Sequence, residues 1–134
     1  MNTADTSVAV AAALPWHEAH AVARSALRRK TPLVAQVAVE AYSVLTRLPP
    51  PQRVPAAIAR DYLKETFSFP PLVLAPGGYT RLLELAAAEA VTGGAVYDAL
   101  VAATARDAGA TLITLDRRAV VTYQLVGVDY KLLG

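Results

Sequence analysis

The apolar run at residues 111–115, Thr-Leu-Ile-Thr-Leu, most limits the folds open to this chain. It is continuous and apolar enough to lie in the middle of a sheet, with a neighbour on each side. A helical segment at 95–108 precedes it and ends at Gly109. Shorter apolar runs alternate with helical segments elsewhere, and this order favours a parallel sheet covered by helices on both faces. The sequence therefore predicts a three-layer α/β/α fold around a small, parallel central sheet.

The other expected elements are short. Further strands are expected at residues 1–4, 33–34, 72–74 and, at a sheet edge, 125–128. Further helices are expected at residues 17–29, 36–48, 54–67 and 79–91. Residues 77–78 and 93–94 are Gly-Gly pairs, which predict turns, and the prolines at 49–51 cannot continue the helix before them.

Length and composition limit the class of protein. We expect one domain over residues 1–134, which is long enough to bury a core without disulfides. The chain has no cysteine, which excludes disulfides and thiolate metal sites. The net charge of +2 permits an anionic partner without demanding one. No signal-peptide pattern or membrane-spanning run is apparent, so we expect a cytoplasmic protein with no membrane partner.

Four of the eleven acidic residues lie in apolar surroundings. They are Asp5, Glu40, Asp98 and Asp116. A carboxylate in such surroundings loses hydration, so hydrogen bonds or a cation must compensate it. Asp5 and Asp116 follow expected strands, and ligands bind outside the carboxyl ends of parallel strands. Two simpler interpretations stay open: Asp98 could cap its helix, and Asp116 could pair with the arginines that follow it.

Four clustered carboxylates would repel one another unless a divalent cation neutralised them. Hard oxygen ligands select Mg²⁺ or Mn²⁺, and such an ion can polarise a phosphodiester and activate water. We therefore predict that these four acids form a site for a divalent cation.

Three segments together resemble the PIN domain. They are Asp5-Thr6-Ser7-Val8 with the isolated Glu40, the helix that opens with Tyr97-Asp98-Ala99, and the stretch 109–118 that contains Asp116. More narrowly, the chain resembles the VapC-type toxins of VapBC toxin–antitoxin systems, and residues 16–20 are also similar to that group. The resemblance covers essentially the whole chain.

The resemblance implies a Mg²⁺- or Mn²⁺-dependent endoribonuclease whose four acids bind the ion and activate water. Thr6 and Thr114 would orient the carboxylates. A VapB-type antitoxin would be the partner, with its C-terminal segment in a groove, and homodimers or toxin–antitoxin hetero-oligomers are expected. Apolar surface on helices 17–30 and 54–67, including Tyr62, Phe67 and Phe69, could bind that partner.

Several other features have two interpretations. Arg117 and Arg118 could hold RNA phosphates or simply lie in a solvated loop. The basic residues Arg24, Arg28, Arg29 and Lys30 could stabilise a helix C-terminus or contact RNA. His17 and His20 have a spacing that can bind metal, but a structural or surface role is favoured because no third ligand is near.

Competing functions are an RNA-processing or DNA nuclease of the same fold without an antitoxin, and a non-catalytic binding module. A phospho-acceptor receiver domain is disfavoured, because it would need an acid pair after its first strand and a lysine after its last.

Overall fold

The computed structural model describes residues 1–134 and contains five strands and seven helices. The strands are β1 (Asn2–Ala4), β2 (Thr31–Val34), β3 (Phe67–Leu72), β4 (Thr111–Thr114) and β5 (Tyr130–Leu132). The helices are α1 (Thr6–Ala13), α2 (His20–Ala26), α3 (Ala35–Thr46), α4 (Ala56–Thr66), α5 (Pro76–Ala88), α6 (Ala95–Asp107) and α7 (Ala119–Val126).

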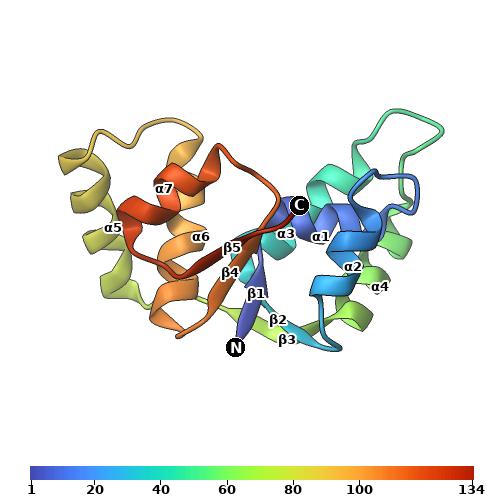
Figure 1. Ribbon diagram of the computed structural model, residues 1–134, viewed down its shortest axis with the longest axis horizontal. Coiled ribbons are helices and arrows are strands. Elements are labelled where there is room, and N and C mark those ends of the chain that lie inside the picture. Colours follow the sequence, from blue (N-terminus) through green and yellow to red (C-terminus); the bar gives the residue numbers. More distant parts are fainter.

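The strands form one sheet in the order β3-β2-β1-β4-β5, and every neighbouring pair is parallel. Helices α1, α2 and α4 lie on one side of the sheet and α5, α6 and α7 on the other (Figure 1). Helix α3 contacts both groups, through α1 and α4 on one side and α6 on the other. The predicted three-layer α/β/α fold with a parallel sheet is confirmed.

The middle of the sheet is short and fully buried. In β1, Ala4 pairs with Leu33 of β2 and with Ile113 of β4. These three side chains are at most 1% exposed. Strand β4 lies between β1 and β5, so the apolar run at 111–115 is internal to the sheet, as its sequence predicts. Because β1 and β4 are adjacent, the residues that follow them meet at one edge of the sheet.

The strand predicted at 72–74 is wrong in position, because β3 begins at Phe67. This strand contains Pro70 and Pro71, which have no N–H to donate, and it lies at the edge of the sheet, where proline is tolerated. Helix α5 begins at Pro76, so the predicted Gly-Gly turn at 77–78 is its first turn. A Cβ on Gly78 would lie 2.7 Å from the side chain of Leu74, so any larger residue here would force the buried Leu74 side chain to move.

The strand predicted at 125–128 is also wrong. Residues 119–126 form α7, and Gly127 ends the helix in the left-handed region with φ of 86°. The edge strand is β5, which follows this turn and pairs with β4.

Helix α2 is shorter than the predicted helix at 17–29. It ends at Ala26, so Arg28, Arg29 and Lys30 lie beyond its last turn. Ala23 is the buried residue of α2, whereas Ala21 and Val22 are exposed.

Helix α4 packs on the core through part of its apolar face. Leu63 and the following Phe67 are buried, but Ile58 is 58% exposed and lies outside the core. Phe67 and Tyr62 pack edge to face, and the Tyr62 hydroxyl donates to the Ala9 carbonyl at 2.7 Å. Tyr62 and Phe67 therefore belong to the interior of the protein, and of the three predicted partner-binding aromatics only Phe69 is exposed. No helix of the structure has the length and apolar character needed to cross a membrane.

Candidate acidic site

Asp5 follows β1 and is the N-cap residue of α1. It is only 5% exposed. The Ser7 hydroxyl and the Val8 backbone N–H donate to Oδ1, and the Tyr123 hydroxyl donates to Oδ2 at 2.7 Å. Both oxygens therefore have hydrogen-bond donors, as a buried carboxylate requires.

Burial and these donors act on Asp5 in opposite directions. Burial is the larger effect and raises the pKa of Asp5, while the hydroxyls of Ser7, Thr114 and Tyr123 and the Val8 N–H lower it. The net pKa is raised, so the donors do not fully replace the water that the carboxylate has lost. A nearby cation would supply the missing stabilisation.

Glu40 is held from two elements. Its Oε2 accepts a hydrogen bond from the Thr6 hydroxyl at 2.7 Å, and its Oε1 accepts one from Gln36 Nε2 at 3.0 Å. Gln36 lies four residues earlier in α3, and residues four apart share a helix face. Thr6, predicted to orient a carboxylate, therefore contacts Glu40 and connects the start of α1 to α3.

Asp98 lies in the first turn of α6, whose N-cap residue is Gly94. The interpretation of Asp98 as a helix cap is therefore wrong. Burial and, after it, the negative charges of Asp116, Glu40 and Asp5 raise the pKa of Asp98 to about 6, while Arg118 opposes them. Asp98 thus experiences the charge of all three other predicted acids.

Asp116 follows β4. Its backbone N–H donates to the Thr114 hydroxyl at 2.9 Å, and the same hydroxyl also lowers the pKa of Asp5. Thr114 therefore connects the two acids that follow the adjacent strands β1 and β4.

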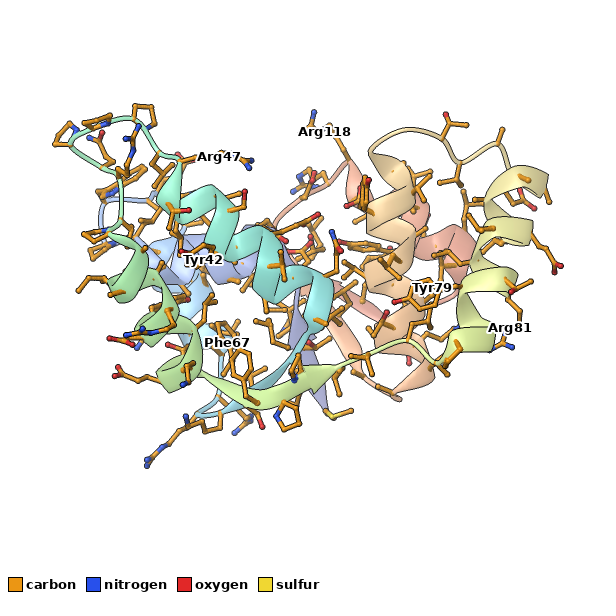
Figure 2. The ribbon with its side chains drawn as sticks, turned by 180° about the vertical axis from the view of Figure 1, so that it is seen from behind. Tyr42, Arg47, Phe67, Tyr79, Arg81 and Arg118 are labelled. Atoms are coloured by element: carbon orange, nitrogen blue, oxygen red, sulfur yellow. The ribbon has the colours of Figure 1, made fainter.

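Asp116 also pairs with Arg118. Its Oδ1 accepts the Arg118 backbone N–H at 3.0 Å and lies 3.7 Å from the guanidinium Nε. The Arg118 side chain is 95% exposed, so the predicted ion pair exists but contributes little to stability. Figure 2 shows Arg118 extending outward at the same end of the molecule as Arg47, which follows α3. Arg117 is exposed as well.

The four carboxylates form one electrostatic group, which we call the acidic cluster: Asp5, Glu40, Asp98 and Asp116. All four side chains carry carboxylate oxygens, the type of ligand that suits Mg²⁺ or Mn²⁺. The charges of Asp5, Glu40 and Asp116 disfavour the charged form of Asp98. The structure contains no group of three acidic or histidine side chains drawn together closely enough to hold a metal ion. Protein donors hold two of the four acids, Asp5 and Glu40, by both carboxylate oxygens.

A depression of about 480 Å³ opens beside the acidic cluster. Thr6, Ser7, Leu115 and Asp116 line it on the side of the cluster, together with Val10, His17, Glu18, Ala19 and Val44. The depression is mixed in polarity, so it can receive a polar group next to Asp116.

The sequence interpretation missed three residues of this site, Ser7, Gln36 and Tyr123. Ser7 is the most connected of them, since its hydroxyl donates to Asp5 and accepts the Leu115 N–H at 2.9 Å. The position of Gln36, four residues before Glu40 on a predicted helix, is the one signal that could have found it. Tyr123 lies 118 residues from Asp5 along the chain, and nothing local indicates the contact.

The two histidines have structural roles, as favoured from their sequence. His20 Nδ1 hydrogen-bonds the Ala11 carbonyl at 2.9 Å, and His17 Nδ1 accepts the Ala19 N–H at 3.0 Å. Both ring nitrogens fix the turn between α1 and α2.

Two solved structures share the fold. The structure of FitAB bound to an IR36 DNA fragment superposes with a TM-score of 0.67 at 17% identity and covers 98% of this chain and 94% of that one. FitAcB from Neisseria gonorrhoeae superposes with a TM-score of 0.65 at 18% identity and covers 97% and 96%.

Sequence relatives are much closer. Ribonuclease VapC40 of Mycobacterium tuberculosis is 48% identical over 133 residues, which is 99% of each chain. Ribonuclease VapC27 of Mycobacterium tuberculosis is 42% identical over 125 residues, 92% of this chain and 90% of that one. The PIN domain family matches residues 3–124, a span that contains all four members of the acidic cluster. The chain therefore belongs to the PIN domain family and, within it, to the VapC group.

Proposed function

We propose that this protein is a divalent-metal-dependent endoribonuclease and the toxin of a VapBC-type toxin–antitoxin system. The observation that carries the proposal is the acidic cluster, in which three carboxylates raise the pKa of a fourth at the carboxyl edge of a parallel sheet. Membership of the VapC group, whose relatives are named ribonucleases, supports RNA as the substrate.

In this proposal Asp5, Glu40, Asp98 and Asp116 hold Mg²⁺ or Mn²⁺ and are the catalytic residues. When bound, such an ion stabilises the developing charge on the phosphodiester and activates water for attack. The protein supplies the orientation of the ligands. Thr6 fixes Glu40, and Thr114 lies between Asp5 and Asp116.

The substrate has a place beside these acids. Arg117 and Arg118 are exposed next to Asp116 and can bind RNA phosphates without losing a strong interaction within the protein. The depression lined by Thr6, Ser7 and Asp116 is adjacent to the cluster, so a single strand bound there brings a phosphodiester to the carboxylates.

We further propose that a VapB-type antitoxin binds in an apolar groove along the face of α3 that carries Val39 and Tyr42. The groove has a volume of about 660 Å³. It is lined by Ala38, Val39, Tyr42, Ala56, Ala57, Arg60, Leu63, Lys64 and Phe69. The partner segment would accordingly be apolar, with acidic residues placed to meet Arg60 and Lys64.

The groove continues toward the acidic cluster. A second hollow of about 210 Å³ shares Val39 with it and includes Gln36, the residue that donates to Glu40. A segment that lies along both hollows ends beside a member of the cluster. This continuity supports a partner that covers the site while it occupies the groove.

Three further proposals concern organisation. Residues 1–134 form a single domain, since all five strands belong to one sheet and one core cluster contains 27 buried residues. The toxin acts in the cytoplasm, where its RNA substrates and its antitoxin are made. It assembles as a homodimer or as a toxin–antitoxin hetero-oligomer, as its group implies.

The test is cleavage of labelled single-stranded RNA with Mg²⁺ or Mn²⁺, without metal, and with EDTA, using wild type and Asp5→Asn. We expect metal-dependent cleavage by wild type and none by the variant. Cleavage that survives both EDTA and the substitution contradicts the metal mechanism. Cleavage of a single-stranded DNA of the same sequence in place of the RNA would instead identify a DNA nuclease.

A further inference from the structure

Tyr123 is the largest fully buried side chain in the protein, with 1% of its surface exposed. It belongs to α7, whose other buried residues are Ala119, Thr122 and Val126. A buried hydroxyl needs a hydrogen-bond partner. The partner here is the carboxylate of Asp5, with Tyr123 Oη donating to Oδ2 at 2.7 Å.

The other oxygen of Asp5 is held by its own segment of chain. Ser7 and Val8, within three residues of Asp5, donate to Oδ1. Local donors on one oxygen and a distant donor on the other define the plane of the carboxylate. Rotation of that plane breaks the hydrogen bond to Tyr123, because the phenol is fixed by the packing of α7.

Helix α7 is also the element that follows Asp116. The Ala119 N–H, in the first residue of α7, donates to the Asp116 carbonyl at 3.2 Å. The same helix therefore begins at one member of the acidic cluster and, one turn later, holds another member through Tyr123. Asp5 and Asp116 are thereby fixed relative to each other from outside the sheet.

We propose that Tyr123 is a positioning residue of the site, which sets the orientation of the Asp5 carboxylate and couples it to Asp116 through α7. The inference rests on the proposed function in that Asp5 acts as a metal ligand. Tyr123 itself touches neither the ion nor the RNA.

The hydroxyl of Tyr123 is suited to be a permanent donor. Burial, the largest effect, and then the charge of Asp5 raise the pKa of Tyr123 above its usual value of 10.0. In the structure the phenol is accordingly the donor and Asp5 Oδ2 the acceptor, at 2.7 Å.

The first test compares Tyr123→Phe with Tyr62→Phe. Each change removes one interior hydroxyl and keeps the ring, but Tyr62 donates to a backbone carbonyl and not to a carboxylate. Mn²⁺ affinity is measured by the electron paramagnetic resonance signal of free Mn²⁺. We expect Mn²⁺ to bind about 10-fold more weakly to Tyr123→Phe, a typical loss when a group that orients a metal ligand is removed. Tyr62→Phe should bind Mn²⁺ as wild type does, and a Tyr123→Phe affinity equal to wild type overturns the proposal.

The second test needs no metal. The side-chain carboxyl ¹³C resonance of Asp5 in labelled, metal-free protein should move in Tyr123→Phe and stay in place in Tyr62→Phe. An Asp5 resonance that does not move in Tyr123→Phe shows that the carboxylate keeps its environment without the hydroxyl, and it rejects the positioning role. A wild-type protein that binds no Mn²⁺ defeats the proposed function, while the ¹³C comparison still decides whether Tyr123 positions Asp5.

Discussion

The two faces of helix α3 differ in whether their side chains have interaction partners within the protein. One face carries Gln36 and Glu40, and the Glu40 carboxylate accepts hydrogen bonds from both Gln36 and Thr6. The other face carries Val39, which is 68% exposed, and Tyr42, which is 39% exposed, along the apolar groove. Figure 2 shows Tyr42 on the side of α3 that faces α4.

The difference matches the two proposed roles: the acidic cluster for catalysis and the apolar groove for antitoxin binding. The acidic cluster is polar, and no buried side-chain polar atom of the protein lacks a partner. In the proposed function, a change to one of its carboxylates should affect catalysis. The groove presents apolar surface to solvent, and its exposed residues, such as Val39 and Tyr42, are available to a partner while Ala38 and Leu63 at its base belong to the core. The two regions should respond to mutation independently.

The largest expected effect lies in the cluster. Asp98→Asn should reduce RNA cleavage by about 10³-fold, because it removes one metal-binding carboxylate and its charge. The measurement is sequencing of RNA 5′ ends after brief expression, which also identifies the RNA that wild type cuts.

The matched control is Asp107→Asn, in the same helix but paired with Arg106 at the surface. It should cleave RNA as wild type does. Equal activity in wild type and Asp98→Asn would remove Asp98 from the catalytic residues. It would also contradict the contrast between a catalytic acidic cluster and an apolar groove that binds the partner.

The next effect lies in the groove. Val39→Asn should weaken antitoxin binding by about 10-fold, the effect of no longer burying a valine-sized apolar side chain. Its RNA cleavage should remain at the wild-type level. Titration calorimetry with purified antitoxin gives the affinity.

Ile58→Asn is the matched control for the groove. Ile58 is 58% exposed on α4 but does not line the groove. The two variants should differ in antitoxin affinity although both replace an exposed β-branched side chain. Equal loss of affinity in both would show that the groove is not the antitoxin site.

The smallest effect is the pH dependence of stability. The pKa of Asp98 is raised from 3.8 to about 6 in the folded protein, so the folded state binds this proton more tightly than the unfolded state. Asp98 therefore contributes stability below about pH 4 that is lost as the pH rises through about 6. Asp98→Asn should melt at higher temperature than metal-free wild type at pH 7, by a few degrees, with the difference shrinking toward pH 4.

Thermal unfolding of both metal-free proteins from pH 4 to 7 measures this difference. Mg²⁺ or Mn²⁺ at pH 7 should raise the melting temperature of wild type more than that of Asp98→Asn, because the ion relieves the same repulsion. A difference in melting temperature between wild type and Asp98→Asn that stays the same at every pH would mean that the neighbouring charges do not raise the pKa of Asp98.

Much of the fold follows from local sequence. The apolar run at 111–115 and the helix that Gly109 ends define β4 and α6, because each pattern is long enough to select one structure. The errors lie where tertiary position decides. Pro70 and Pro71 obscure β3, which exists because an edge strand tolerates them, and the apolar residues 125–126 join α7 because Gly127 ends a helix there.

The sequence predicts the acidic residues of the site but not the residues that hydrogen-bond to them. The four acids stand out because carboxylates are rare among apolar neighbours. The groups that hold Asp5 do not stand out, since serine and tyrosine are common and their contacts depend on the sheet. Leu115 reaches Ser7 across 108 residues of chain, and Tyr123 reaches Asp5 across 118. Only the parallel pairing of β1 with β4 brings these positions together.

The pairing of β1 with β4 also determines how late during translation the site can form. The ribosome makes β1 first and β4 near the end, yet β1 lies between β2 and β4 in the finished sheet. Contacts over such separations form late, because the closure of a long loop precedes any gain from them. The nascent chain therefore carries Asp5 without the Tyr123 phenol that donates to it and without the neighbouring strand β4. The full set of contacts around Asp5 therefore forms only after α7 has been synthesised.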